Sequence, residues 1–197
     1  FSVAMKQVIK SPKIAAASLS IFTALALAIL KLLTGLFTGS LAVLTSAIDS
    51  LLDILMSGIN LMAIRHAEQP ADEDHPYGHG KFETLATIFQ AFVIAASGAW
   101  IIYEAIQRMI ESSPIKQTGV GIIVMCISTV ASFMISRHLR RVAKATDSSA
   151  LEADSLHFSM DVYTNLALLA GLVLISLFDL PWLDPVMSLL VAIYILF

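Results

Sequence analysis

The sequence predicts an all-α integral membrane protein with six transmembrane helices and both termini on the cytoplasmic side. Hydrophobic residues make up 57% of the 197 residues and charged residues only 14%, whereas about a quarter of the residues of a soluble domain are charged. The mean hydropathy is +0.82. Apolar runs recur through nearly the whole chain and are long enough to cross a bilayer as helices.

Helix-breaking residues divide the chain into these apolar spans. Pro12 near the first span, Gly39 before the second and Pro181 before the sixth are typical of helix boundaries. Ser149 and Glu152 form a predicted capping box at the start of the fifth span. The predicted spans are Ile14–Phe37, Ser40–Arg65, Phe82–Ile110, Thr118–Val142, Ser149–Phe178 and Leu183–Phe197. Residues 1–197 are therefore expected to form one six-helix transmembrane domain, cut from a longer protein.

The distribution of basic residues predicts the orientation. With the N-terminus in the cytoplasm, the opposite side receives only Arg108 and Lys116, and Lys31 lies within the first span. The cytoplasmic side receives the other nine: Lys6, Lys10, Lys13, Arg65, Lys81, Arg137, Arg140, Arg141 and Lys144. This bias favours both termini inside and places the connection between the second and third spans in the cytoplasm. The net charge of −3 gives no indication of a nucleic-acid partner.

Four ionisable residues interrupt the apolar spans. Asp49 and Asp53 lie in the second span, and His157 and Asp161 lie in the fifth. Each pair is spaced i, i+4, so both of its side chains project from one helix face. An ionisable group at the bilayer centre costs about 2.5–3.5 kcal/mol even on the lenient insertion scale, so these groups should face one another or water.

Depth along the helices supports a meeting of the two pairs. At about 1.5 Å per residue, each pair reaches the middle of a hydrocarbon core about 30 Å thick. Three carboxylates and one imidazole can then close a four-coordinate shell that suits Zn2+, Cd2+ or Fe2+ better than Mg2+ or Ca2+. A hydrogen-bond network or a proton relay without a metal fits the spacing equally well.

Three stretches carry a resemblance to a known family. They are HPYGHGKFE (75–83), SAIDSLLD (46–53) and ALEADSLHFSMDV (150–162). Together they resemble the cation diffusion facilitator family of divalent metal/proton antiporters, in its zinc-type form. The resemblance implies a homodimer in which each protomer has its own midmembrane site and exchanges cytoplasmic metal for external protons. It also implies a cytoplasmic C-terminal domain, which residues 1–197 do not include.

The resemblance also implies a second metal site in the polar loop DEDHPYGHGKFE. Asp72, His75 and His79 match that site. The two histidines lie four residues apart across a Pro-Tyr-Gly turn, and the neighbouring Gly78 and Gly80 let the backbone turn tightly. Two imidazoles and a carboxylate can hold zinc with a water or another residue as the fourth ligand. A solvated turn is the alternative interpretation of the same residues.

Two functions follow from these sites. Metal binding requires deprotonated aspartate and neutral histidine, so protons and metal compete for the same ligands, as a secondary antiporter requires. The leading prediction is export of Zn2+, with Cd2+ or Fe2+ as further substrates, across the bacterial inner membrane. The alternative is an intramembrane zinc-dependent hydrolase. The sequence contains no HExxH motif, and four protein ligands would leave no open position for catalysis, so we do not expect an enzyme.

Overall fold

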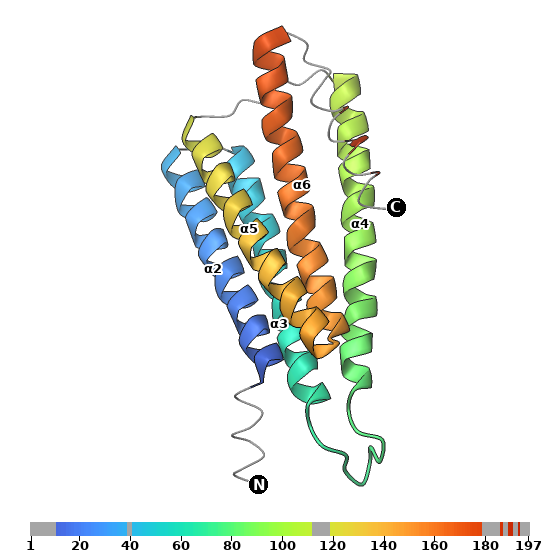
Figure 1. Cartoon of the computed structure of the whole chain (residues 1–197). Helices are drawn as coiled ribbons and strands as arrows, with labels where there is room; N and C mark the ends of the chain where they lie inside the picture. The colour runs from blue at the N-terminus through green and yellow to red at the C-terminus, as the bar shows by residue number, and fades with distance from the viewer. Residues whose placement is uncertain are drawn as a thin grey trace.

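The computed structural model describes residues 11–38, 41–111 and 119–178, together with the isolated positions 186, 189, 190 and 193. All regular structure within this part of the chain is α-helical, as predicted. The helices are α2 (Pro12–Thr38), α3 (Leu41–Ala67), α4 (Lys81–Glu111), α5 (Gly119–Thr146) and α6 (Ser149–Phe178), shown in Figure 1. They correspond to the first five predicted spans. The sixth, Leu183–Phe197, lies outside the described residues except at the isolated positions.

Three of these helices are long and apolar enough to cross a membrane by length and hydropathy alone. They are the segments Pro12–Phe37, Lys81–Gln107 and Gly119–Thr146. Neither α3 nor α6 is among them. These two helices carry the paired ionisable residues of the predicted midmembrane site, and charged side chains lower the mean hydropathy of a helix.

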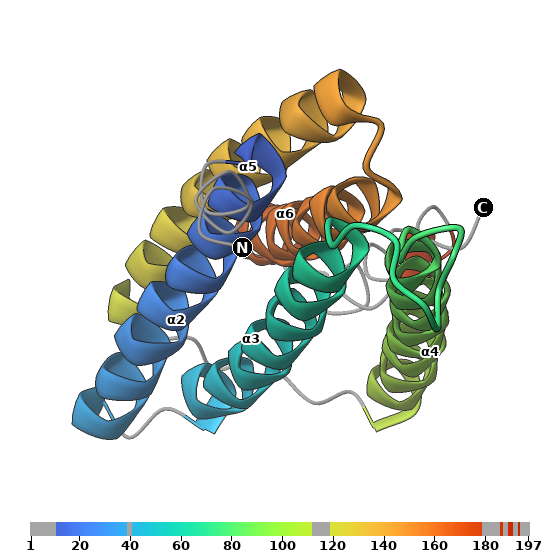
Figure 2. The same cartoon turned by 90° about the horizontal axis from the view of Figure 1, so that it is seen from below.

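The helices form a bundle in which α6 is central. Helix α6 packs against α5, α4 and α3 and touches α2, while α2 packs mainly on α3 and α5. Seen from below in Figure 2, α6 lies between α5 and α4, and α3 lies beside it. The long connection between α3 and α4 projects from the lower end of the bundle in Figure 1, and we call this end the loop end.

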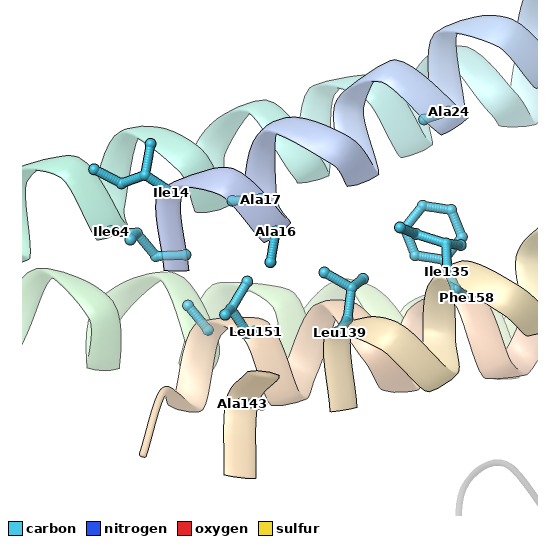
Figure 3. Packing of buried hydrophobic residues seen from close by; sticks show 11 residues of the cluster. Ile14, Ala16, Ala17, Ala24, Ile64, Ile135, Leu139, Ala143, Leu151 and Phe158 are labelled. Carbon is cyan, nitrogen blue, oxygen red and sulfur yellow. The ribbon is translucent and has the colours of Figure 1, made fainter. Parts of the chain in front are cut away.

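The core near the loop end joins α2, α3, α5 and α6. Leu139, Leu151 and Phe158 are among its most deeply buried side chains. In Figure 3, Ala16 of α2 lies near Leu139 and Leu151, and Phe158 lies further along the bundle beside Ile135. Small residues such as alanine allow the backbones of neighbouring membrane helices to approach closely.

The connection between α5 and α6 is only two residues long and corrects one prediction. Asp147 has φ 53°, and the Ser148 amide donates to the Ala143 carbonyl at 3.1 Å, which is a Schellman ending of α5. The Ser148 hydroxyl accepts a hydrogen bond from the Leu151 amide at 3.3 Å. The N-cap of α6 is therefore Ser148 and not the predicted Ser149. Helix α6 begins at Ser149, which places Ser148 at the capping position just before its first turn.

Candidate functional site

The structure brings three of the four predicted midmembrane residues together. Asp53 of α3 and His157 and Asp161 of α6 each offer a ligand atom, and these atoms all lie within 4.8 Å of one another. His157 Nε2 lies 2.8 Å from Asp53 Oδ1, although the two residues are 104 positions apart in the sequence. Their side chains are 12% and 14% exposed. Two carboxylates and one imidazole at this spacing can hold a single divalent cation.

Asp49 lies one turn before Asp53 on α3 but outside this group of three. Its residue is exposed, whereas Asp53, His157 and Asp161 are half-buried. Between the two aspartates on α3, Ser50 is buried and accepts a hydrogen bond from Lys31 Nζ of α2 at 2.9 Å. A basic side chain of the first span therefore lies at the same level as the acidic pair.

The short contact between His157 and Asp53 has a chemical consequence. A carboxylate can only accept a hydrogen bond, so a proton must lie on one of the two atoms that face each other. That proton occupies the lone pair that a metal ion would use. A proton and a metal ion therefore compete for the same two atoms.

The second group lies in the loop between α3 and α4. Ligand atoms of Asp72, His75 and His79 lie within 4.8 Å of one another. His75 Nδ1 is 3.3 Å from Asp72 Oδ1, and His79 Nε2 is 3.4 Å from Asp72 Oδ2. The two imidazole centroids are 4.5 Å apart. Asp72 thus contacts each imidazole ring through a different carboxylate oxygen.

Backbone hydrogen bonds hold the loop in this shape. The His75 amide donates to Asp72 Oδ1 at 2.7 Å, and the Gly78 amide donates to the His75 carbonyl at 2.9 Å. Gly78 has φ +80°, a conformation that side-chain-bearing residues rarely adopt. The hydrogen bond from the His75 amide is the largest cause of a pKa of Asp72 below its ordinary value of 3.8; burial opposes it, and the charges of the two histidines add to the lowering.

His79 anchors the loop to the bundle. It is 7% exposed, and its ring stacks on Phe82 of α4 with a centroid distance of 6.0 Å. His79 Nδ1 is buried without a hydrogen-bond partner among the described residues. A ligand at this loop would therefore be held against the first turn of α4.

Other polar residues at the loop end connect the helices. Glu83 of α4 forms an ion pair with Lys13 of α2 at 3.5 Å and accepts a hydrogen bond from Ser148 at 2.6 Å. Glu68 accepts a hydrogen bond from Ser11. Local patterns in the sequence do not predict these contacts, because the residues that make them are single polar positions far apart in the sequence with no common spacing.

Comparison with known proteins identifies the family. Residues 17–197 match the cation efflux transmembrane domain. The chain belongs to the cation efflux family. It is therefore a multi-pass membrane protein of a transporter family and not an enzyme, as predicted.

Curated relatives of this family carry the name cation-efflux pump FieF. The chain is 39% identical to the one from Shewanella oneidensis over 137 residues, which are 70% of this chain and 46% of that protein. It is 38% identical to the one from Escherichia fergusonii over 138 residues, with the same two coverages. The match to the Klebsiella pneumoniae protein is 37% over 138 residues. The chain thus aligns with less than half the length of these curated relatives.

Proposed function

We propose that this chain is the six-helix transmembrane domain of a homodimeric exporter that exchanges cytoplasmic Zn2+ for protons across the bacterial inner membrane. Both termini would lie in the cytoplasm, and Cd2+ and Fe2+ would be further substrates. The name of the relatives, cation-efflux pump, supports export of a cation. The choice of zinc rests on the donor set, because one imidazole with carboxylates suits borderline metals.

The observation that carries this proposal is the 2.8 Å contact between His157 Nε2 and Asp53 Oδ1. This contact requires a proton between two atoms that would bind the metal. Entry of a divalent cation must displace that proton, and return of a proton must weaken metal binding. Asp161 is the third ligand of this site, and Asp49 supplies the fourth from the preceding turn of α3.

The loop residues Asp72, His75 and His79 form a second, weaker site in this proposal. Asp72 and His75 are exposed, so water competes for the metal more effectively there than in the bundle. Water would also complete the shell as a fourth ligand. The acidic neighbours Glu73 and Asp74 raise the local concentration of cations at the entrance.

Proteoliposomes containing a zinc-sensitive dye test the exchange. We expect zinc to enter the vesicles when their lumen is more acidic than the bath, because protons leaving the lumen drive zinc inward. A protonophore should stop this uptake, and the Asp53→Ala variant should show none. Zinc flux of equal size with and without the pH gradient would instead indicate a passive channel and would overturn the proposed exchange.

A further inference from the structure

A second polar cluster lies one helical turn from the Asp53–His157 contact, toward the loop end. Ser57 follows Asp53 by four residues on α3, and Asp154 precedes His157 by three on α6. The cluster draws on α2, α3, α4 and α6, and each member is at most 1% exposed: Ser20, Ser57, Asn60, Gln90 and Asp154. Burying this many polar groups in a membrane bundle is costly unless each of them finds a partner.

Two hydrogen bonds in the cluster converge on one carboxylate oxygen. Asp154 Oδ1 accepts from Ser57 Oγ at 3.3 Å and from Gln90 Nε2 at 3.4 Å. The other end of the Gln90 amide, Oε1, accepts from Asn60 Nδ2 at 2.6 Å. The donation to Asp154 sets the orientation of the Gln90 amide, and that in turn sets the orientation of Asn60.

Two acceptor atoms in the cluster are left over. Asp154 Oδ2 and Asn60 Oδ1 are both buried and have no hydrogen-bond partner among the described residues. The amide oxygen of Asn60 can only accept a hydrogen bond, and the same holds for Asp154 Oδ2 as long as Asp154 is ionised. The cluster therefore lacks a donor hydrogen, and an ionised Asp154 cannot provide one.

The surroundings of Asp154 offset a negative charge only through neutral hydrogen-bond donors and the charge of His157. The helices packed against it present neutral groups, namely Ser20 of α2, Ser57 of α3 and Gln90 of α4. The titratable neighbour among the described residues is His157, whose Nε2 is already engaged with Asp53. An ionised Asp154 would add a further negative charge one turn from the Asp53–His157 contact and two turns from Asp161, in a low-dielectric interior where like charges repel strongly.

We propose that Asp154 is a proton-binding site, separate from the metal ligands, that carries a proton on Oδ2 in the metal-free protein. The proton turns Oδ2 from an acceptor into a donor. It would donate to Asn60 Oδ1, the acceptor in the cluster that lacks a donor. A neutral carboxylic acid also removes the cost of holding a charge inside a membrane bundle. This site is additional to the proton between His157 and Asp53, and it does not depend on whether the chain exchanges zinc for protons.

Infrared difference spectroscopy of the whole chain in lipid vesicles, at neutral pH and without metal, tests the proposal. The spectrum of the wild type minus that of Asp154→Asn should contain the carbonyl-stretch band of a protonated carboxylic acid, and this band should shift in D2O. Absence of the band would mean that Asp154 is ionised and would overturn the proposal. Asp147→Asn is the matched control, because Asp147 is exposed and its difference spectrum should lack the band.

A second variant tests the hydrogen bond and needs no change at Asp154. Asn60→Leu removes the acceptor, so the band should move to higher frequency and appear as a shifted pair in the difference spectrum. An unmoved band would show that the proton is not bonded to Asn60 and would overturn that part of the site. Asp154→Asn itself should unfold at nearly the wild-type temperature, because an amide keeps one acceptor and one donor, whereas Asp154→Ala keeps neither.

Discussion

At the scale of single residues, the candidate midmembrane ligands are not equivalent. Asp53, His157 and Asp161 have their ligand atoms within 4.8 Å of one another, while Asp49 is exposed one turn away. A metal that enters would find three ligands close to their final places and would need a rearrangement of the fourth. Ligands that are already in place contribute most to affinity, because no free energy is spent on ordering them.

The first prediction compares the two aspartates of α3. Asp53→Ala should weaken zinc binding about a hundredfold or more, equivalent to about 2.7 kcal/mol, and Asp49→Ala only about tenfold. Calorimetric titration of the purified variants with zinc measures both. Equal losses would mean that Asp49 binds the metal as directly as Asp53 does.

The second prediction concerns metal selectivity. His157→Asp replaces the nitrogen in the shell by oxygen, and manganese tolerates an all-oxygen site better than zinc or cadmium does. The variant should therefore lose zinc affinity more than manganese affinity in a competition experiment at one fixed pH. If the ratio of zinc to manganese affinity stays the same, His157 is not a ligand of the transported ion.

The third prediction concerns the loop site and its pH dependence. The lowered pKa of Asp72 means that its carboxylate is lost only as the pH falls below the ordinary value of 3.8, so Asp72 stays ionised near neutrality. Asp72→Asn should weaken zinc binding to the loop near neutral pH, because a neutral amide replaces an ionised carboxylate ligand. Calorimetric titration of the variant with zinc measures the loss.

The double variant His75→Ala with His79→Ala is the control for the loop. It should remove one bound zinc per protomer and leave zinc binding at the midmembrane group in place. Unchanged zinc binding to the loop in Asp72→Asn would contradict the assignment of Asp72 as a ligand.

At the scale of elements, the α5–α6 hairpin sets the position of the functional residues of α6. Asp147 ends α5 in a left-handed conformation, and Ser148 starts α6 at the next residue. Ser148 also donates to Glu83 of α4, so the first turn of α6 is tied to two other helices. Asp154, His157 and Asp161 follow within the next turns of this anchored helix.

The fourth prediction tests this anchor against the cap predicted from sequence. Ser148→Ala removes a helix cap, worth about 1 kcal/mol, and a hydrogen bond to a carboxylate, worth about 1.5–3 kcal/mol. Ser149→Ala removes only the hydrogen bond that Ser149 accepts from Thr87, worth about 1 kcal/mol. Thermal unfolding in detergent should therefore show a clearly larger loss for Ser148→Ala, and the reverse order would restore Ser149 as the cap.

At the scale of the whole molecule, apolar side chains lie on the outside of the bundle and several polar side chains lie inside it, the reverse of a soluble protein. Large apolar side chains such as Phe22, Phe37 and Phe92 are 68%, 88% and 73% exposed. Asn60, Gln90 and Asp154 are at most 1% exposed. This distribution suits a bundle whose surroundings are hydrocarbon, because lipid satisfies no polar group.

The fifth prediction tests the lipid-facing surface. Phe92→Asp introduces a charge on the exposed side of α4, roughly 16 Å from its start at 1.5 Å per residue, and should impair membrane insertion. The cost is about 2.5–3.5 kcal/mol on the insertion scale. Phe92→Leu should insert normally, as should Asp53→Ala, which removes a buried charge. Protease accessibility of membrane fractions measures insertion, and normal insertion of Phe92→Asp would contradict a lipid-facing position.

Local patterns in the sequence determined the class of the protein and much of its local structure. Long apolar runs predicted the helices that the structure describes, and the i, i+4 spacing placed Asp53 and His157 on polar faces of α3 and α6. The short loop kept Asp72, His75 and His79 close together, because few residues separate them. Each of these predictions depended on neighbours within about one or two helical turns, where spacing alone determines which side chains share a face.

Only the tertiary structure decided which of the predicted ligands come within reach of one another and how the buried polar groups are paired. The depth of the two pairs predicted their meeting, and Asp53 and His157 do meet across 104 positions, while Asp49 lies outside their group. Asp154 is tied to Ser57 and Gln90 on two other helices. The physical reason is that the rotation of each helix about its axis is set by packing against its neighbours, through small residues and tertiary hydrogen bonds that no local spacing encodes.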